Sequence, residues 1–245
     1  MIDYSIYSNI GSREVNEDSA GCFENGDARC FIVCDGLGGH GMGDVASSLV
    51  TECFGDELRT LPGEKEDICG FLPSAFMKAQ NKLLEEQKAR RASSKMKTTA
   101  AALVTDAQDA YIGHVGDSRV YIFRHNKVLK RTLDHSIPQM LVLSREIKES
   151  QIRNHPDRNI VLRVMGVEWE DPMYELMDPI ALKKCQAFLL CTDGFWELIE
   201  EKEMCALLKK ASSADEWLKS MAEEIRANGK GRELDNYTAV AVWNV

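Results

Sequence analysis

The segment FIVCDGLGGHGMGDVASSLV, residues 31–50, allows two interpretations of the fold because of its glycines. An apolar run ends at Asp35, and Gly36, Gly38 and Gly41 follow in the order G-x-G-x-x-G before a segment with helical spacing. The same order occurs in dinucleotide-binding βαβ units, where a second parallel strand follows the helix. Glycines beside a carboxylate also let the backbone approach a ligand closely.

The segment after this helix excludes the dinucleotide interpretation. The residues RTLPGEKEDICG, 59–70, show no strand pattern, and apolar positions from Ile68 to Leu83 then repeat at helical spacing. A phosphate-binding P-loop is excluded as well, because no G-K-[ST] follows the glycines. Two interpretations remain: a ligand site built on Asp35, or a tight strand-to-helix turn in which Asp35 is incidental.

The composition is that of an ordinary globular chain. Hydrophobic residues make up 44% and charged residues 28% of the 245, and no low-complexity segment divides them, so we expect one domain over residues 1–245. No stretch approaches the roughly 18 apolar residues of a membrane span, and the N-terminus lacks the pattern of a signal peptide. We therefore expect a cytoplasmic monomer without membrane insertion.

Charge and cysteine spacing exclude further classes. A net charge of −9 argues against nucleic acid as a partner, because phosphate backbones are bound by basic surfaces. The eight cysteines are scattered singly, which is typical of reduced core residues. Cys30 and Cys34 are spaced C-x3-C without a second pair, so structural zinc is disfavoured.

Hydrophobic periodicity places strands and helices in separate blocks, which indicates an α+β fold. Residues 137–160 are polar and helical, and residues 98–134 resemble a run of antiparallel hairpins with turns at AQD, GDS and HN. Strands are predicted over 19–25, 28–35, 98–106, 109–117, 118–126, 127–134, 186–193 and 236–245, and helices from Val45, from Ile68 and, as a pair, over 202–227.

Acidic residues recur at the tips of the apolar strands. Asp35 is joined there by Glu17, Asp18, Asp117, Asp193 and Asp235. A solvated charge run would be contiguous, whereas these acids are scattered along the chain. Carboxylates gathered at one place repel one another unless cations neutralise them, and oxygen ligands without cysteine or histidine suit Mg²⁺ or Mn²⁺.

The chain resembles the type 2C metal-dependent serine/threonine protein phosphatases (the PPM family), in particular the single-domain bacterial form. Eight segments occur in the family's order and cover nearly the whole chain: REVNED, VCDGLGGHGMGDVAS, TTAAALV, GHVGDSRVYIFR, LDHS, HPDRNIVLRVMG, LLCTDGFWELI and DNYTAVAV. The resemblance implies a four-layer α/β/β/α sandwich, in which helix pairs flank two antiparallel sheets.

By this resemblance, Asp35 bridges two Mn²⁺ or Mg²⁺ ions. Glu17 and the Gly36 carbonyl complete one site, and Asp193 and Asp235 complete the other. A water held between two such ions attacks phosphorus directly, without a phosphoenzyme.

The resemblance also assigns supporting residues. Arg13 takes the phosphate-binding position, with an exposed ion-pairing arginine as the alternative. Asp117 helps to hold a third, weaker ion, or else caps a hairpin turn. Asp18 orients water or backbone, and Asn236 shapes the turn beside Asp235.

Two positions depart from the family pattern. Leu37 stands where eukaryotic members carry a histidine that acts as general acid, so the proton donor is left open. Lys97 replaces the usual glycine before the threonine pair. His40 and His135 are interpreted as structural, and residues 137–160 match the mobile flap of bacterial members.

The function implied is hydrolysis of phosphoserine and phosphothreonine in proteins, in opposition to serine/threonine kinases. The expected partners are phosphorylated proteins and a cognate kinase. Two alternatives stay open: a non-catalytic phosphoprotein-binding pseudophosphatase, and a phosphatase for small metabolites on the same fold.

Overall fold

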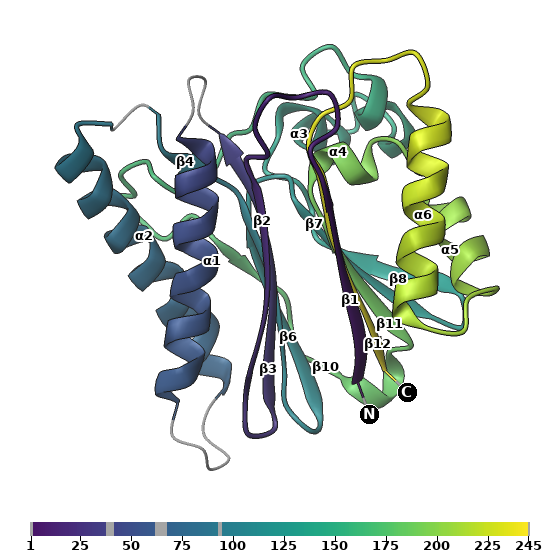
Figure 1. Cartoon of the computed structure of the whole chain (residues 1–245), viewed down its shortest axis with the longest axis horizontal. Coiled ribbons are helices and arrows are strands. Elements are labelled where there is room, and N and C mark those ends of the chain that lie inside the picture. The colour runs from purple at the N-terminus through teal and green to yellow at the C-terminus, as the bar shows by residue number, and fades with distance from the viewer. Residues whose placement is uncertain (1, 38–41, 62–67, 93–94, 245) are drawn as a thin grey trace.

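The computed structural model describes residues 2–37, 42–61, 68–92 and 95–244, and two antiparallel sheets pack face to face in it (Figure 1). One sheet has the order β1-β12-β11-β7-β8 and the other the order β10-β6-β5-β3-β2, with β4 beside β3 and β9 beside β6. The strands are β1 (Ile2–Asn9), β2 (Asp18–Asn25), β3 (Ala28–Leu37), β4 (Lys97–Thr98), β5 (Ala100–Thr105), β6 (Asp109–Val115), β7 (Arg119–Arg124), β8 (Lys127–Arg131), β9 (Glu175–Leu176), β10 (Ile180–Ala181), β11 (Ala187–Cys191) and β12 (Tyr237–Asn244).

Helices cover the outer face of each sheet, as Figure 1 shows for α1 and α2 on one side and α5 and α6 on the other. The helices are α1 (Gly43–Thr60), α2 (Phe71–Arg90), α3 (Ile137–Leu143), α4 (Asp193–Trp196), α5 (Glu201–Leu208) and α6 (Ala214–Asn228), with short 3-10 turns at Ile68–Gly70, Glu149–Asn154 and Leu182–Lys184. The predicted α/β/β/α sandwich is confirmed.

The strand β3 shows why the central strands read as continuous apolar runs. Phe31 and Val33 face the opposite sheet, whereas Cys30, Ile32 and Cys34 face α1 and α2, and all five are fully buried. Successive side chains of a strand point to opposite faces, so a strand covered on both sides is apolar at every position. Both cysteines are free core thiols, as expected.

The prediction of a hairpin at GDS is wrong. Strand β6 lies in one sheet and β7 in the other, so the chain crosses between the sheets at Gly116 to Ser118. Gly116 has φ of 102°, a conformation that favours glycine. Periodicity marks a strand but does not reveal which sheet it joins.

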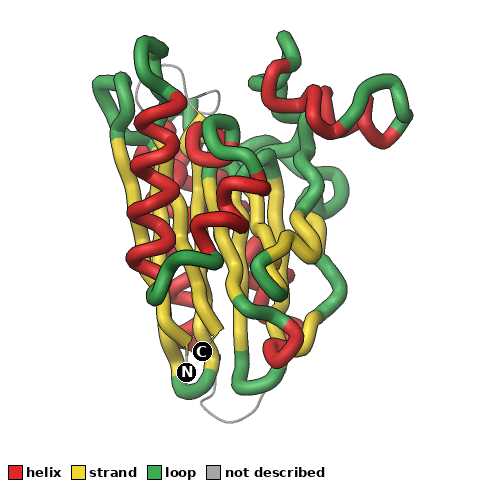
Figure 2. Tube along the Cα trace, turned by 90° about the vertical axis from the view of Figure 1, so that its right-hand side faces the viewer, coloured by secondary structure: helices red, strands yellow, loops and turns green. Residues whose placement is uncertain are grey.

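The N-terminal strand is an element that the sequence pattern did not indicate. Strand β1 pairs along its whole length with β12, from Ile2 opposite Asn244 to Asn9 opposite Tyr237. The two termini consequently lie side by side (Figures 1 and 2). No helix among the described residues is long and apolar enough to cross a membrane.

The segment 137–160 is helical, as predicted, with α3 followed by the 3-10 turn Glu149–Asn154. Arg153 anchors it to the rest of the molecule. Its guanidinium donates to the carbonyls of Trp196 and Ile199 at 3.1 and 3.2 Å, and to Glu201 at 2.9 Å.

Candidate metal centre

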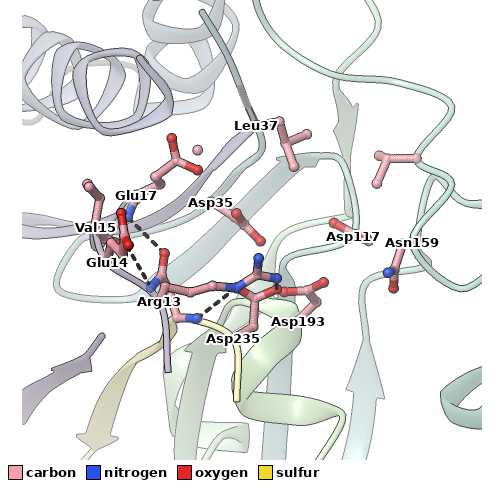
Figure 3. Close-up of a pocket in the computed structure, with 13 residues that line it drawn as sticks. Arg13, Glu14, Val15, Glu17, Asp35, Leu37, Asp117, Asn159, Asp193 and Asp235 are labelled. Carbon is pink, nitrogen blue, oxygen red and sulfur yellow. Dashed lines mark hydrogen bonds and ion pairs between the residues drawn. The ribbon is translucent and has the colours of Figure 1, made fainter. Parts of the chain in front are cut away.

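A cavity of about 470 Å³ opens where the predicted acidic residues meet (Figure 3). The end of β3, the segments that follow β6 and β11, and the segment that precedes β12 all supply residues to it. Eight of the nine predicted site residues line this cavity: Arg13, Glu17, Asp35, Gly36, Asp117, Asp193, Asp235 and Asn236. These predicted residues therefore lie around one cavity, and Asp18 alone among them lies outside its lining.

The backbone of Asp35 is held by a threonine pair. Its amide donates to Thr99 Oγ1 at 2.9 Å, and its carbonyl accepts from Thr98 Oγ1 at 2.8 Å and from the Thr99 amide at 2.9 Å. Thr99 Oγ1 also lies 2.7 Å from Ser118 Oγ, beside Asp117. Neither threonine was predicted as a site residue, although both lie in the motif TTAAALV, which could have indicated the clamp.

Asn236 does more than shape the turn beside Asp235. Its Oδ1 accepts from the Glu17 amide at 2.8 Å, and its Nδ2 donates to the carbonyls of Ile10 and Val15 at 2.9 and 3.0 Å. These bonds tie the loop between β1 and β2 to the start of β12. The amide side chain thereby sets the position of Glu17 at the cavity.

Arg13 reaches across the cavity mouth to Asp235. Its Nη2 lies 2.8 Å from Asp235 Oδ2, and the two side chains are 60% and 45% exposed (Figure 3). Arg13 therefore forms an exposed ion pair, as the alternative interpretation expected. Its partner Asp235 is itself a predicted metal ligand, so the pair also places Arg13 beside the predicted phosphate-binding site. An exposed pair of this kind contributes only about 0–1 kcal/mol and exchanges readily.

The cavity concentrates acidic side chains, and Arg13 pairs with one of them, Asp235. Burial and the charges of Asp193, Asp18 and Asp117 raise the pKa of Asp35 well above its usual range. Burial and Asp193 likewise raise the pKa of Asp117, and burial and Asp235 raise that of Asp193.

Asp18 lies behind this cluster. Burial raises its pKa to about 7, with Asp193 and Asp235 adding to the effect. Its Oδ2 accepts from Thr192 Oγ1 at 2.9 Å, whereas its Oδ1 is buried without a partner. Buried carboxylates are costly unless cations compensate them, so the donor set fits hard divalent ions such as Mg²⁺ or Mn²⁺.

The acidic side chains of the cavity are too far apart to share ions in their present positions. In the part of the chain that the structure describes, no three of the cavity's acidic side chains offer oxygen atoms within 4.8 Å of one another. Binding of shared ions therefore requires these side chains to draw closer.

Asp117 is fixed by its neighbours, and the hairpin that it was alternatively expected to cap does not exist. Trp196 Nε1 donates to the Asp117 carbonyl at 3.0 Å. The ring of Trp196 stacks on the buried Arg119, whose Cζ lies 3.4 Å from the ring centroid. Helix α4 thus supplies both Asp193 and the residue that holds Asp117.

The two departures from the family pattern lie opposite each other. Leu37 lines the cavity. Lys97 is the residue opposite Leu37 in the β3–β4 pair. His135, expected to be structural, accepts a hydrogen bond at Nδ1 from the Gly116 amide at 3.2 Å. His40, with Gly38 and Gly41, lies outside the described residues.

A second cavity of about 390 Å³ adjoins the first and shares Arg13, Asn159, Asp193 and Asp235 with it. Three more arginines, Arg153, Arg158 and Arg232, line it. The acidic cavity therefore adjoins a surface that carries arginines together with Glu197 and Glu233, and the sequence pattern did not indicate this surface.

Comparison with known proteins agrees with this architecture. The family described as Protein phosphatase 2C matches residues 7–237. The chain belongs to this family. The family is metal-dependent, and the resemblance inferred from the eight motifs is confirmed.

Similar proteins carry consistent names. The serine/threonine phosphatase stp of Listeria welshimeri is 33% identical over 233 residues, which span 94% of this chain and 90% of that protein. The serine/threonine protein phosphatase PstP of Mycobacterium tuberculosis is 26% identical over 98% of this chain and 44% of its own length. The crystal structure of serine/threonine phosphatase Stp1 from Staphylococcus aureus superposes with a TM-score of 0.90, at 26% identity, over 100% of this chain and 96% of that one.

Proposed function

We propose that this chain hydrolyses phosphoserine and phosphothreonine esters in proteins at the acidic cavity. One observation carries the proposal: acidic side chains from separate strand ends of both sheets meet around one cavity, with Arg13 at its mouth. The names of the similar proteins support protein substrates.

The acidic side chains would hold divalent cations, Mn²⁺ or Mg²⁺. Glu17, Asp35 and the Gly36 carbonyl would hold one ion, and Asp35, Asp193 and Asp235 would hold the second. Asp117 would contribute to a third, weaker site. Bound ions supply an acidified water as nucleophile and neutralise phosphate charge.

The protein's own side chains would position the metal ligands and bind the substrate phosphate. The Thr98–Thr99 clamp and Asn236 orient Asp35 and Glu17 before any ion arrives. Arg13 is paired with Asp235 without ions, and an ion on Asp235 would free its guanidinium. A freed guanidinium can grip two phosphate oxygens of the substrate.

The surroundings favour a phosphoprotein over a small metabolite. The cavity continues into the second cavity lined by Arg153, Arg158 and Arg232, and residues 137–160 stand beside both. Side chains on either side of a phosphoserine have room there. The presence of Glu17, Asp35, Asp193 and Asp235 speaks against a pseudophosphatase.

Other expectations stay predictions. These are a cognate serine/threonine kinase, a monomeric state, a cytoplasmic location and a role of Asp18 in orienting water or backbone.

The test is hydrolysis of a phosphothreonine peptide with Mn²⁺, with Mg²⁺ and with chelator. Wild type is compared with Asp35→Asn and Asp193→Asn, and with Asp27→Asn as control. Asp27 is exposed at the β2–β3 turn, at the opposite end of the hairpin from Asp35. Circular dichroism verifies that all four proteins are folded.

We expect turnover that requires metal, with a loss of at least about 100-fold in Asp35→Asn and Asp193→Asn, as for removal of a strong electrostatic contribution. Asp27→Asn should retain wild-type turnover. Folded wild type without turnover on peptide or on p-nitrophenyl phosphate, with either metal, would exclude the proposed enzyme.

A further inference from the structure

A second cluster of ligating side chains lies outside the acidic cavity. His114 on β6, His135 after β8 and Glu175 on β9 each offer one ligand atom, and these atoms all lie within 4.8 Å of one another. The β6–β9 pair sets His114 directly opposite Glu175. None of the three side chains lines the acidic cavity.

The two histidines are buried and stacked. Their exposed fractions are 1% and 8%, their ring centroids lie 4.5 Å apart, and their planes are inclined by 21°. The side chain of Glu175 is 52% exposed, so the cluster has one open side. Burial lowers the pKa of both histidines, that of His135 to about 4, and neutral imidazole is the form that binds metals.

One ring nitrogen of the pair has no hydrogen-bond partner among the residues that the structure describes. His114 Nε2 lies 2.7 Å from the Leu133 carbonyl, and because a carbonyl only accepts, this nitrogen carries the proton. Nδ1 of His114 therefore bears a lone pair, and it is buried without a hydrogen bond. An unpartnered buried acceptor costs about 1–3 kcal/mol, so a ligand that engages it is favoured.

We propose that His114 Nδ1, His135 Nε2 and Glu175 form a binding site for Zn²⁺. Two imidazoles and one carboxylate are a common zinc donor set, with bond lengths of about 2.0–2.2 Å. The acidic cavity offers only oxygen atoms, which Mg²⁺ and Mn²⁺ prefer. The molecule thus carries two sites with different donor chemistry, and this second site goes beyond the proposed phosphatase function.

Occupation of the site changes the contact of His135 with the chain crossover. Without the ion, His135 Nδ1 accepts from the Gly116 amide at 3.2 Å, and Nε2 carries the proton 3.4 Å from Glu175 Oε2. When Zn²⁺ takes Nε2, the proton of the neutral ring moves to Nδ1, which then cannot accept from Gly116. The rings also have to tilt out of their stack, because an ion must lie near the plane of each ring.

This change reaches the residue next to Gly116. Asp117 follows it directly, so Zn²⁺ should loosen the crossover that presents Asp117 to the acidic cavity. The expected consequence is inhibition by Zn²⁺ at saturating Mn²⁺. This consequence rests on the proposed role of Asp117, whereas the zinc site itself does not.

The experiment adds Zn²⁺ to Mn²⁺-saturated wild type, Glu175→Gln and Glu170→Gln. Glu170→Gln is the control, because Glu170 is exposed in the same segment and takes no part in the cluster. Bound zinc is measured by equilibrium dialysis with elemental analysis, and released Mn²⁺ by electron paramagnetic resonance. Nitrogen-15 correlation spectra of the histidine rings identify the nitrogens that bind, and turnover of p-nitrophenyl phosphate is followed in parallel.

The expected result is one Zn²⁺ per wild-type chain without release of Mn²⁺, with shifts of the His114 and His135 ring resonances. Glu175→Gln should bind Zn²⁺ at least about tenfold more weakly, and Glu170→Gln should behave as wild type. Zinc uptake that equals Mn²⁺ release and is the same in both variants would overturn the site, as would no uptake. Uptake without inhibition would establish the site and overturn only its link to Asp117.

Discussion

At the scale of single residues, Asp18 is a buried carboxyl group whose negative charge is unfavourable in the metal-free protein. It forms a cross-strand pair with Asp35, and the carboxylates of Asp193 and Asp235 raise its pKa further. Thr192 and Thr238 act in the opposite direction by hydrogen bonding, but burial dominates. The stability of the metal-free protein should therefore depend on the protonation of Asp18.

The sign of this dependence follows from the raised pKa of Asp18, about 7 in the folded protein against an ordinary 3.8. Between these values the folded state keeps a proton that the unfolded state releases, so the free energy of unfolding falls as pH rises from about 4 to about 7. The fall should amount to a few kcal/mol, at about 1.4 kcal/mol per pKa unit.

The measurement is urea unfolding at pH 4 to 7 in the presence of chelator, for wild type, Asp18→Asn and the exposed Asp27→Asn. The free energy of unfolding of wild type should fall relative to that of Asp18→Asn as pH rises. Asp27→Asn should show no such trend. A constant difference for Asp18→Asn across this range would contradict the prediction.

Asn236 is a second residue whose role is visible only in three dimensions. Asn236→Ala removes the bonds to Glu17, Ile10 and Val15, and should cost about 1–3 kcal/mol of unfolding free energy. It should also weaken Mn²⁺ binding, because Glu17 loses its support. Thermal unfolding and Mn²⁺ titration measure the two effects.

Asn244→Ala is the matched control for this variant. Asn244 stands at the other end of β12, and its Nδ2 donates to the carbonyls of Leu182 and Cys185. It should lose comparable stability and keep wild-type Mn²⁺ affinity. Equal Mn²⁺ affinity in both variants would show that Asn236 supports the fold alone.

At the scale of elements, a buried ion pair joins β7 to the loop after β8 and to α4. Arg119 Nε and Nη2 donate to the two oxygens of Asp134 at 2.8 and 2.6 Å, and both side chains are 1% exposed. The same guanidinium stacks on Trp196, which holds Asp117. Three elements of the candidate site are thus fixed by one arginine.

Removal of the negative partner should be costly, because Arg119 would stay charged and buried. We expect Asp134→Asn to lower the free energy of unfolding by about 3 kcal/mol. Asp56→Asn breaks an exposed pair with Arg59 and should cost no more than about 1 kcal/mol. Urea unfolding compares the two variants. Similar small losses of unfolding free energy in both would mean that other groups compensate the charge of Arg119.

At the scale of the whole molecule, the site exists because two sheets and the segment 137–160 meet at one end of the sandwich. This segment exposes Met140 and Leu143, 59% and 63% accessible, without any role in holding the cavity. We predict that Met140→Ser with Leu143→Ser lowers kcat/KM for a phosphoprotein several-fold. Turnover of p-nitrophenyl phosphate and the melting temperature should stay unchanged.

Leu129→Ser serves as control, since Leu129 is 44% exposed on β8 outside this segment. It should leave both substrates unaffected. Equal losses on phosphoprotein and aryl phosphate in the double variant would contradict a role of this segment in selecting substrates.

Local sequence patterns indicated most of the helices and strands, though not β1, together with the α+β class and the residues predicted to carry the chemistry. Period-two and helical patterns are local, and acids at strand tips with glycine, serine or asparagine after them are recognisable in one dimension. Asp35, Asp193 and Asp235 could be named for this reason. The family resemblance rested on the same local motifs.

Only the tertiary structure decided which strand joins which sheet, and which groups meet. At Gly116 the chain passes from one sheet to the other. The pairing of β1 with β12, the clamp on Asp35 and the cluster of His114, His135 and Glu175 each join residues far apart in sequence. A buried strand has the same apolar pattern in either sheet, so periodicity carries no information about its neighbours. Partners across a fold are selected by packing and by the need to satisfy buried polar groups, which act in three dimensions.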